Sequence, residues 1–449
     1  MKVIVAGAGE VGFNIADKLS KEKADVVLIE NNPVRLTAIA DLIDVQCLQG
    51  SASNPLILKK AGIEEADIFV AVTSSDESNI LSCSLARLLA PDVRRAARVR
   101  DPLLYKTLIE DSLTEGLGLN YLVDPTGLTV DTILDFLSLP GAVDVIDVAD
   151  GKLKFVGVRL AKNHRAVGKT LAEVLPRTEG SVLLVVAIYR QHQVLIPTGA
   201  TVLRAKDLLY LAATPAHLTD LGKFFELEFR PASTVFIMGG GEVGLGLARR
   251  LEERNLTVKL VEQNQERCEY LSQELAKTIV LQGDATDQGL LEDEGINDCD
   301  VFIAVGTDDE KNMVSCLLAK RLGAANTITR VNRFSYVPLV SAIGLESLVS
   351  ARVAATSAIL KYVRKGLVVT VATLQNEDAE VVEIVVPLTS KMVGCSLQNL
   401  KIPSGSIIGA ILRDGEAIIP RGDTVIEAED TLAVVARSEV VSQITKAVT

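Results

Sequence analysis

Short apolar runs alternate with amphipathic stretches along the first part of the chain. KVIVAG, DVVLIE and DIFVAVT (residues 2–7, 25–30 and 67–73) are apolar apart from their end residues, as in strands that are buried on both faces. Between them lie VGFNIADKLSKEK and NPVRLTAIADLID (11–23 and 32–44), whose apolar residues recur at helical spacing. Because strands and helices alternate, the pattern predicts a βαβ series that forms a doubly wound parallel sheet.

The same pattern occurs twice. GAGEVG at 7–12 matches GGGEVG at 239–244, and ARVR at 97–100 matches TRVN at 329–332, both 232 residues later. The copies therefore stay in register through a whole sheet-forming unit, and we expect two domains of the same α/β fold.

A second, smaller repeat follows each copy of the first. VLIPTGATVLRAKDLLYLAA (194–213) resembles AIIPRGDTVIEAEDTLAVVA (417–436). Both contain short strand-like runs around an I-P-x-G turn, which predicts a compact α+β domain with one short helix.

Between each large and small unit lies one further helical pattern. TVDTILDFLSLPG and ATSAILKYVRKG end in Gly141 and Gly366, which are typical helix terminators. They predict hinge or crossover helices near residues 131–141 and 356–366, where movement and subunit packing could occur, and plain core helices are the alternative.

The predicted fold class is α/β, with two Rossmann-like doubly wound parallel-sheet domains, each followed by a small α+β domain. A linker with Pro231 separates the halves at 226–233. The expected domain bounds are 1–125, 142–226, 232–352 and 368–449.

Composition and charge narrow the possible functions. The chain has 449 residues, no Trp and a net charge of −12, with a pI near 5.0. The acidic balance argues against nucleic-acid binding and against attachment to anionic lipid. No apolar run approaches the ~18 residues that span a bilayer, and the N-terminus already starts a strand, which leaves no room for a signal peptide.

Cysteine and histidine usage indicates no metal site. The six Cys form no CxxC or CxxH pair, and only three His are present, all in the small units. This usage is typical of a reduced cytosolic protein rather than of a zinc site or a disulfide framework.

The glycine-rich turns predict nucleotide binding. Gly7-x-Gly9-x-x-Gly12 follows a strand and opens a helix, and Glu30 closes the next strand. The first glycine makes the turn, the second lets the backbone approach a pyrophosphate, and the third lets the helix pack on the strand. The helix N-terminus favours phosphate, and the carboxylate accepts from ribose hydroxyls and disfavours NADP. Empty tight turns are the alternative.

Other candidate residues follow neighbouring strands at the same carboxyl edge. An Arg there could pair with phosphate, although a surface Arg is the alternative. The candidate nucleotide-binding residues are Gly7, Ala8, Gly9, Glu10, Val11, Gly12, Glu30, Ser51, Thr73, Ser74, Arg98 and Arg100 in the first half, and Gly239, Gly240, Gly241, Glu242, Val243, Gly244, Glu262, Asp284, Thr307, Asp308 and Arg330 in the second.

The two predicted pockets differ in charge. Arg100 and Ser51 of the first are replaced by Asn332 and Asp284 in the second. We therefore expect the first pocket to suit extra phosphate, as in ATP, and the second to suit a dinucleotide.

Catalytic patterns are absent from the strand ends. No His lies in the nucleotide-binding repeats, and no P-loop, nucleophile elbow or paired carboxylates follow a strand. Asp76, Glu77, Asp309 and Glu310 are expected as first-turn helix charges, with a divalent ion beside phosphates as the alternative. The sequence favours a ligand-driven switch over an enzyme.

The tandem order of these motifs carries a family resemblance over the whole chain. GAGEVG…E…GSAS…AVTSSDESN…ARVR with IPTG, repeated as GGGEVG…E…GDAT…AVGTDDEKN…TRVN with IPRG, resembles the tandem-RCK regulatory subunits of Trk-type potassium uptake systems. The resemblance implies two nucleotide-binding RCK-N (KTN) domains, each followed by an RCK-C domain.

The resemblance also implies ligands, partners and location. It implies binding of NAD(H) and ATP or ADP, and gating of a potassium-translocating membrane subunit of the TrkH or TrkG type. It implies a homotetramer, whose lobes form a ring of eight, in the cytoplasm on the inner face of the membrane through that partner. Arg100 becomes a candidate for contacting a terminal phosphate. The alternatives are an NAD-dependent oxidoreductase with duplicated Rossmann domains and a regulator of another cation transporter.

Overall fold

The computed structural model describes residues 1–139, 141–149, 151–175, 183–191, 193–214, 218–225, 232–345, 347–364, 368–374 and 379–448. The chain divides into two compact units, and each contains segments from both halves of the sequence. The first comprises Met1–Asp131, Gly240–Arg250 and Ser350–Val363, and the second comprises Thr132–Gly239, Leu251–Val349 and Arg364–Thr449.

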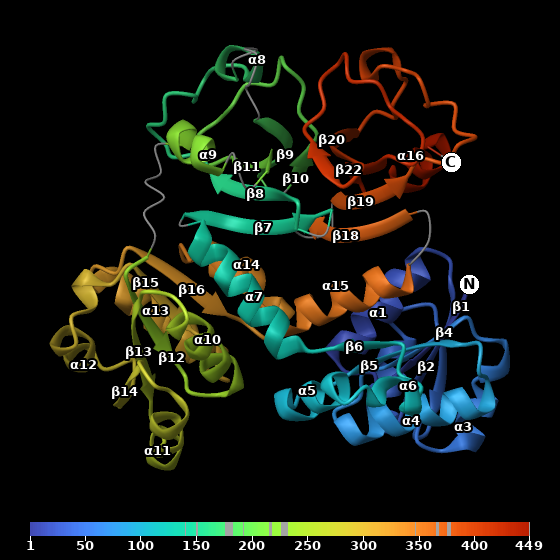
Figure 1. The fold of residues 1–449 in the computed structure, drawn as a ribbon, viewed down its shortest axis with the longest axis horizontal. Helices are drawn as coiled ribbons and strands as arrows, with labels where there is room; N and C mark the ends of the chain where they lie inside the picture. Colours follow the sequence, from blue (N-terminus) through green and yellow to red (C-terminus); the bar gives the residue numbers. More distant parts are fainter. Residues whose placement is uncertain are drawn as a thin grey trace. The chain divides into compact units, whose positions relative to one another are not determined.

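The first unit contains a six-stranded parallel sheet in the order β3-β2-β1-β4-β5-β6 (Figure 1). Its strands are β1 (Lys2–Ala6), β2 (Asp25–Glu30), β3 (Gln46–Gln49), β4 (Ile68–Ala71), β5 (Arg94–Arg98) and β6 (Tyr121–Val123). Its helices are α1 (Glu10–Lys21), α2 (Pro33–Ala40), α3 (Pro55–Lys60), α4 (Asp76–Leu89), α5 (Pro102–Glu110) and α6 (Leu113–Leu117). The strand order reverses between β1 and β4, which confirms the predicted doubly wound sheet and places its switch point there.

Side-chain caps fix where four of these helices begin. Asn32, Asn54, Ser75 and Asp101 each accept hydrogen bonds from backbone N–H groups in the first turn of α2, α3, α4 and α5, respectively. A proline follows the cap in α2, α3 and α5, where its missing N–H leaves no hydrogen bond unmade.

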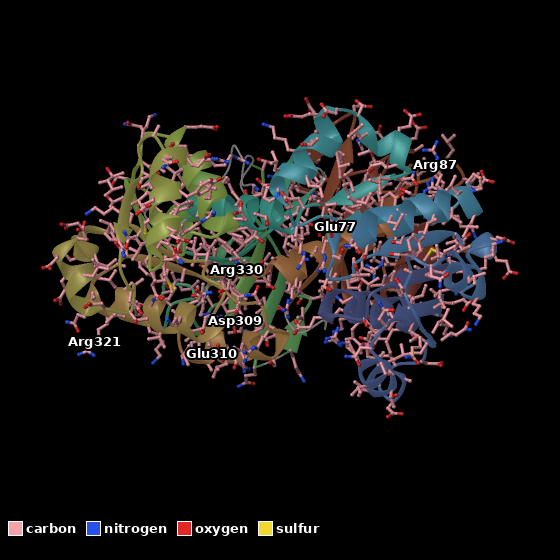
Figure 2. The ribbon with its side chains drawn as sticks, turned by 90° about the horizontal axis from the view of Figure 1, so that it is seen from below. Glu77, Arg87, Asp309, Glu310, Arg321 and Arg330 are labelled. Carbon is pink, nitrogen blue, oxygen red and sulfur yellow. The ribbon has the colours of Figure 1, made fainter. Side chains whose placement is uncertain are left out.

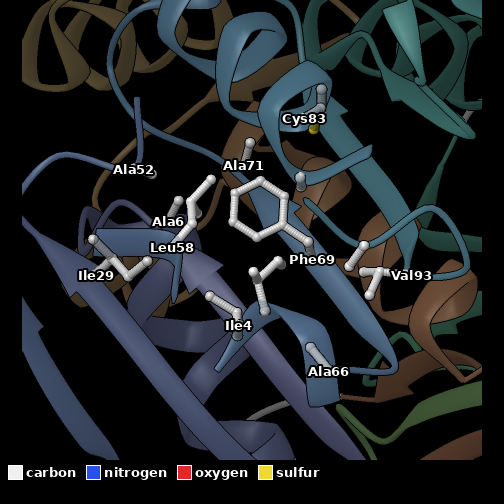
Figure 3. Packing of buried hydrophobic residues seen from close by; sticks show 14 of the residues in the cluster. Ile4, Ala6, Ile29, Ala52, Leu58, Ala66, Phe69, Ala71, Cys83 and Val93 are labelled. Atoms are coloured by element: carbon white, nitrogen blue, oxygen red, sulfur yellow. The ribbon is translucent and has the colours of Figure 1, made fainter. Parts of the chain in front are cut away.

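An apolar core covers each face of the first sheet. On one face, Phe69 is fully buried in a cluster with Ile4, Leu58 and Cys83 (Figure 3). The cores of the first unit contain many Val, Ile, Leu and Ala residues, as the aromatic-poor composition predicts.

The other face of the sheet is covered by α1 together with α15 (Ala351–Val363), a helix from the second half of the sequence. Ile15 and Leu19 of α1 belong to the same buried cluster as Ala355 and Ile359 of α15. Full burial of an isoleucine or leucine side chain contributes about 1.5–3 kcal/mol to the free energy of unfolding. This face of the first sheet therefore depends on α15 for its stability.

The C-terminal end of α15 is also anchored to the first sheet. Arg94 donates to the backbone oxygens of Tyr362 (3.4 Å) and Val363 (3.2 Å), and the rings of Tyr121 and Tyr362 stack with centroids 4.7 Å apart. The helix begins before the predicted 356–366 segment and is a packed core helix over its described length, while Gly366 lies outside the described residues.

The equivalent helix α7 (Pro125–Ser138) likewise begins before the predicted segment 131–141. Its first turns contact α10 (Glu242–Glu252), where Arg250 pairs with Asp131 at 3.3 Å. A Cβ placed on Gly246 would lie 3.6 Å from Val130. Gly141 follows α7 with φ +88°, a conformation that suits glycine after a helix.

A second six-stranded parallel sheet repeats the first, in the order β14-β13-β12-β15-β16-β17. Its strands are β12 (Thr234–Met238), β13 (Thr257–Glu262), β14 (Ile279–Gln282), β15 (Val301–Ala304), β16 (Asn326–Arg330) and β17 (Ser347–Val349). The accompanying helices are α11 (Gln265–Glu274), α12 (Gln288–Asp293), α13 (Asp309–Leu322) and α14 (Val337–Ala342). The predicted second Rossmann-like sheet is therefore confirmed.

Two five-stranded antiparallel sheets form the small domains, in the orders β10-β9-β11-β8-β7 and β18-β19-β22-β20-β21. The strands are β7 (Ala142–Val148), β8 (Leu153–Arg159), β9 (Leu184–Arg190), β10 (Gln193–Leu195), β11 (Leu208–Ala213), β18 (Val368–Leu374), β19 (Ala379–Val385), β20 (Ser406–Arg413), β21 (Glu416–Ile418) and β22 (Thr431–Arg437), with helices α8 (Leu171–Val174), α9 (Leu218–Phe225) and α16 (Val441–Val448).

These two sheets share one core within the second unit. Phe155 and Val186 of the first belong to the same buried cluster as Val381 and Val435 of the second. A Cβ on Gly409 would lie 2.7 Å from Val186, so glycine permits the close approach of the two sheets.

Each small domain contains the same buried ion pair. Asp207 accepts from Nε and Nη2 of Arg190 at 2.7 and 2.6 Å, and from the backbone N–H of Arg204 at 2.8 Å. Arg413 and Asp430 repeat the bidentate pair at 2.8 Å for both bonds. Both carboxylates are almost fully buried, so their charges depend on these partners.

Several predicted features need separate mention. Pro231 and most of its linker, His192 and His217 lie outside the described residues. His164 is buried, with Nε2 3.0 Å from the carbonyl oxygen of Phe224. Among the described helices, none combines the length and apolarity needed to cross a membrane.

We predict that Asp207→Ala lowers the free energy of unfolding by about 3–5 kcal/mol, because it leaves the Arg190 guanidinium part-buried without its carboxylate. Urea unfolding followed by circular dichroism measures the change. Asp423→Ala is the matched control: Asp423 is exposed in the other small domain, and its loss should change stability by less than about 0.5 kcal/mol. Equal unfolding midpoints for the two variants would contradict the prediction.

Candidate functional site

Two glycines of the first loop are required by the fold itself. Gly7 has φ +100°, and a Cβ there would lie 2.8 Å from backbone atoms of Thr73, in the loop after β4. A Cβ on Gly12 would overlap the carbonyl oxygen of Gly7. Only glycine allows β1, α1 and the loop after β4 to approach this closely.

Gly9 is different, because the protein's own packing does not require it. Its φ of −69° and ψ of 179° are open to any residue, and no described atom lies within 4 Å of the Cβ that another residue would add. Gly9 also provides no side-chain cap for α1, in contrast to the caps of α2 to α5. The loop therefore presents an open backbone surface and first-turn N–H groups, which suit a phosphate group.

The carboxylate of Glu30 lies beside this loop. It accepts from the backbone N–H of Ala8 at 2.8 Å and from that of Asn32 at 2.9 Å. Arg35 lies 3.8 Å from the same carboxylate. In the second half, Glu262 accepts from the N–H of Asn264 at 2.9 Å. Both carboxylates thus close the second strand of their sheet, as expected for groups that bind a ribose.

Ser51 and the two loop valines have local structural contacts. The Ser51 hydroxyl accepts from the N–H of Ser53 at 3.2 Å, in the turn after β3. Val11 and Val243 are buried. The side chains of Val11 and Val243 therefore contribute to packing, so only the backbone atoms of these two residues are available to contact a ligand.

Asn79 organises the opposite side of the first site, and it was not among the predicted residues. Its buried amide accepts from the N–H and hydroxyl of Thr73, both at 2.8 Å, and donates to the carbonyl of Arg98 at 2.9 Å. One side chain thus joins the loops after β4 and β5. The sequence repeat contained the signal, because Asn312 stands at the same place in the second copy.

Asp76 and Asp309 also have structural roles. Asp76 accepts from the backbone N–H groups of Arg100 (2.8 Å) and Asp101 (2.9 Å). Asp309 accepts from those of Asn332 (2.8 Å) and Arg333 (2.9 Å). Each carboxylate, in the first turn of its helix, therefore fixes the loop after the fifth strand of its sheet.

Two arginines of the first half converge beside the loop after β4. Arg98 donates through Nη2 to the carbonyls of Val72 (3.1 Å) and Thr73 (2.8 Å), whereas its buried Nε has no acceptor among the described residues. Burial, followed by the nearby charge of Arg100, lowers the pKa of Arg98 to about 10. Arg100 donates to the carbonyl of Ser74 and lies 3.5 Å from Asp76.

The second loop repeats the first in its backbone. Gly239 has φ +104°, and a Cβ there would lie 2.9 Å from the backbone N of Gly306. As at Gly9, no described atom lies within 4 Å of a Cβ on Gly241. The second loop has the same pair of properties: one glycine required by packing and one that leaves an open surface.

The loop after β15 differs chemically from its counterpart after β4. Asn312 donates to the carbonyls of Gly306 (3.0 Å) and Arg330 (2.9 Å), but its buried Oδ1 has no partner among the described residues. Gly306 replaces Thr73, whose hydroxyl fills this role in the first half. A Cβ on Gly306 would lie 2.9 Å from Asn312 Oδ1, so a larger residue there would require the Asn312 side chain to shift.

The additional acidic residues of the second half are partly engaged. Asp284 accepts from the N–H and hydroxyl of Thr286, which lowers the pKa of Asp284, and it lies 3.8 Å from Lys311. Asp308 caps α13 through the N–H of Lys311, while Thr307 is exposed. These hydrogen bonds lower the pKa of both carboxylates and keep them ionised, and the Lys311 ammonium offsets part of their negative charge.

The segment at the end of β16 differs from its counterpart at the end of β5 in the position of its second arginine. Arg330, labelled in Figure 2, donates to the carbonyl of Val305 at 3.2 Å. Asn332 replaces Arg100. Arg333 instead forms an ion pair with Glu310 at 3.1 Å. Among the described residues, no three His, Cys, Asp or Glu side chains group closely enough to hold a metal ion.

Comparison with protein families finds two domain models that each match the chain twice. The TrkA-N domain model matches residues 3–124 and 235–351, and the TrkA-C domain model matches residues 155–226 and 381–449. The Trk system potassium uptake protein TrkA of Vibrio alginolyticus is 37% identical over 434 residues, which cover 96% of this chain and 94% of that protein. The protein of the same name from Haemophilus influenzae is 36% identical over 441 residues, with 97% and 95% covered.

Solved structures share the fold. The crystal structure of the GsuK RCK domain has a TM-score of 0.60 at 22% identity and covers 99% of this chain and 95% of that one. The GsuK channel bound to NAD has a TM-score of 0.59 at 20% identity and covers 100% and 78%. The chain is similar to RCK domains over nearly its whole length.

We predict that Asn79→Ala lowers the free energy of unfolding more than Asn312→Ala does. The first change leaves the Thr73 N–H and the Arg98 carbonyl without their partner, at a cost of about 1–3 kcal/mol for each buried group, whereas Asn312 makes fewer bonds. Urea unfolding and amide hydrogen exchange at Thr73 test this. An unchanged exchange rate at Thr73, or a larger loss for Asn312→Ala, would contradict it.

Proposed function

The chain belongs to the TrkA family of Trk-system potassium uptake proteins, and on this premise we propose that it is a nucleotide-sensing regulatory subunit that gates a potassium-translocating membrane protein. The partner is of the TrkH or TrkG type, and the chain acts as a homotetramer in the cytoplasm, on the inner face of the membrane. Its nucleotide-binding domains are residues 1–125 and 232–352, and its RCK-C domains are residues 142–226 and 368–449.

The observation that carries this proposal is the open position at Gly9 and again at Gly241. The neighbouring Gly7 and Gly239 are explained by contacts inside the protein, but these two are not. A backbone kept bare beside a helix N-terminus suits the close approach of a pyrophosphate. Glu30 and Glu262 lie where each would accept from a ribose, so both halves fit an adenine nucleotide.

The two sites take different ligands in this proposal. Arg98 and Arg100 give the first site two guanidinium groups for the additional charge of ATP over ADP. Asn332 leaves the second site with Arg330 alone, which suits NAD(H). In the proposed assembly the RCK domains form a ring with two conformations. A nucleotide stabilises the conformation that binds it more tightly, and it can shift the equilibrium by no more than the difference in its binding free energy between the two conformations.

We predict that Gly9→Ala folds normally and weakens nucleotide binding at the first site by at least about tenfold. The added methyl group meets no described atom of the protein but narrows the surface offered to the pyrophosphate. Isothermal titration with ATP, ADP and NADH measures binding, and thermal unfolding checks the fold. Gly241→Ala is the matched variant for the second site. Unchanged affinities for all three ligands in both variants would refute the proposed sites.

We further predict that Arg100→Ala and Glu262→Ala affect different ligands. Loss of Arg100 should weaken ATP binding by about tenfold and leave NADH binding within about twofold, because only ATP offers the extra phosphate charge. Glu262→Ala should weaken NADH binding and spare ATP. Parallel titrations of both variants test the assignment, and a loss of the same ligand in both would overturn it.

A further inference from the structure

Arg352, near the start of α15, lies at the first glycine loop. Its Nη1 forms an ion pair with a carboxylate oxygen of Glu10, the first residue of α1 and the neighbour of Gly9. Both side chains are partly exposed, at 37% for Arg352 and 43% for Glu10, so the pair can open without unfolding the core. A guanidinium from residue 352 thus lies beside the loop formed by residues 7–12.

This guanidinium adds to the positive charge that Arg98 and Arg100 bring to the same region. The charges of Arg100 and Arg352 both oppose protonation of Arg98, and Asp76 favours it. Asp76 lies 3.5 Å from Arg100, and Glu10 pairs with Arg352, whereas Arg98 is bonded to backbone carbonyls. Three cations therefore gather around a loop whose bare backbone already suits an anion.

Glu10 occupies the position that a phosphate would compete for. A carboxylate in the first turn of α1 is stabilised by the helix N-terminus, as a phosphate would be. An incoming phosphate would repel Glu10 and attract Arg352. Glu10 thus occupies the place at Arg352 that a phosphate group would take. The negative charge of a bound phosphate favours a switch of Arg352 from Glu10 to the ligand.

The repeat has no cation at the position equivalent to Arg352. The helices α7 and α15 each begin two residues after the last strand of their parallel sheet, which puts Thr126 at the helix position of Arg352. The N–H of Thr126 is bonded to Asp124 at 2.8 Å. Arg352 and Thr126 thus differ in the same way as Arg100 and Asn332. In each comparison the arginine lies at the first site and the uncharged residue is its counterpart in the repeat.

We propose that Arg352 is a phosphate-contacting residue of the first nucleotide site, that it exchanges its ion pair with Glu10 for the phosphate, and that it favours a nucleoside triphosphate over the diphosphate. This inference rests on the proposed nucleotide site and assigns one of its specificity-determining residues to the second half of the chain.

Isothermal titration of the full-length protein with ATP and ADP tests this, using Arg352→Gln and Glu10→Gln. Arg352→Gln should weaken ATP binding by about tenfold and ADP binding by about threefold or less. Glu10→Gln should tighten ATP binding, because it removes the competing carboxylate. A pair that served only to fasten α15 to α1 would not give these opposite signs.

Lys361→Gln, on the same helix but in its last turn, is the matched control and should leave both affinities within about twofold. Thermal unfolding of each variant checks the fold, and Arg352→Lys, which keeps the charge, should retain part of the preference for ATP. Wild-type protein that binds ATP, together with unchanged affinity in Arg352→Gln or weaker ATP binding in Glu10→Gln, would overturn the role of Arg352 alone. Wild-type protein that binds no adenine nucleotide would overturn the proposed site as well.

Discussion

The close approach of two backbones at the switch point of each parallel sheet is the constraint on which the rest of the structure depends. At Gly7 and Gly239 the turn after the first strand lies against the loop after the fourth, with no room for a side chain. A buried amide, Asn79 or Asn312, then joins that loop to the end of the next strand. The carboxyl edge of each sheet is thereby held in one arrangement, and the open glycine surfaces are part of it.

The sequence was sufficient to predict both kinds of sheet and the position of both glycine loops, because periodicity and the repeat act locally. It could not predict which copy of a repeated helix packs on which sheet, since both copies have a suitable apolar face. The structure shows that α15 covers the first sheet. The sequence offered phosphate pairing or a surface position for Arg98, and neither includes the two backbone carbonyls that accept from Nη2 of Arg98. Residues such as Asn79 act through buried hydrogen bonds that no pattern of hydrophobicity reveals.

The two halves keep one framework and differ in the chemistry placed on it. Thr73 gives the first half a hydroxyl that satisfies the buried Asn79 oxygen, and Gly306 gives the second half none. Arg100 is replaced by Asn332, and Arg352 has Thr126 as its counterpart. In the proposed function, the two halves provide two similar nucleotide-binding sites. A few substitutions at the edges of these sites give them different ligand specificities.

The helix from the second half that covers the first sheet has a consequence for dividing the chain. A fragment that ends before α15 would expose to water the apolar face on which Ala355 and Ile359 pack beside Ile15 and Leu19. The compact unit that contains the first sheet takes segments from both halves of the sequence. A cut between the halves would therefore split one hydrophobic core instead of releasing two self-sufficient domains.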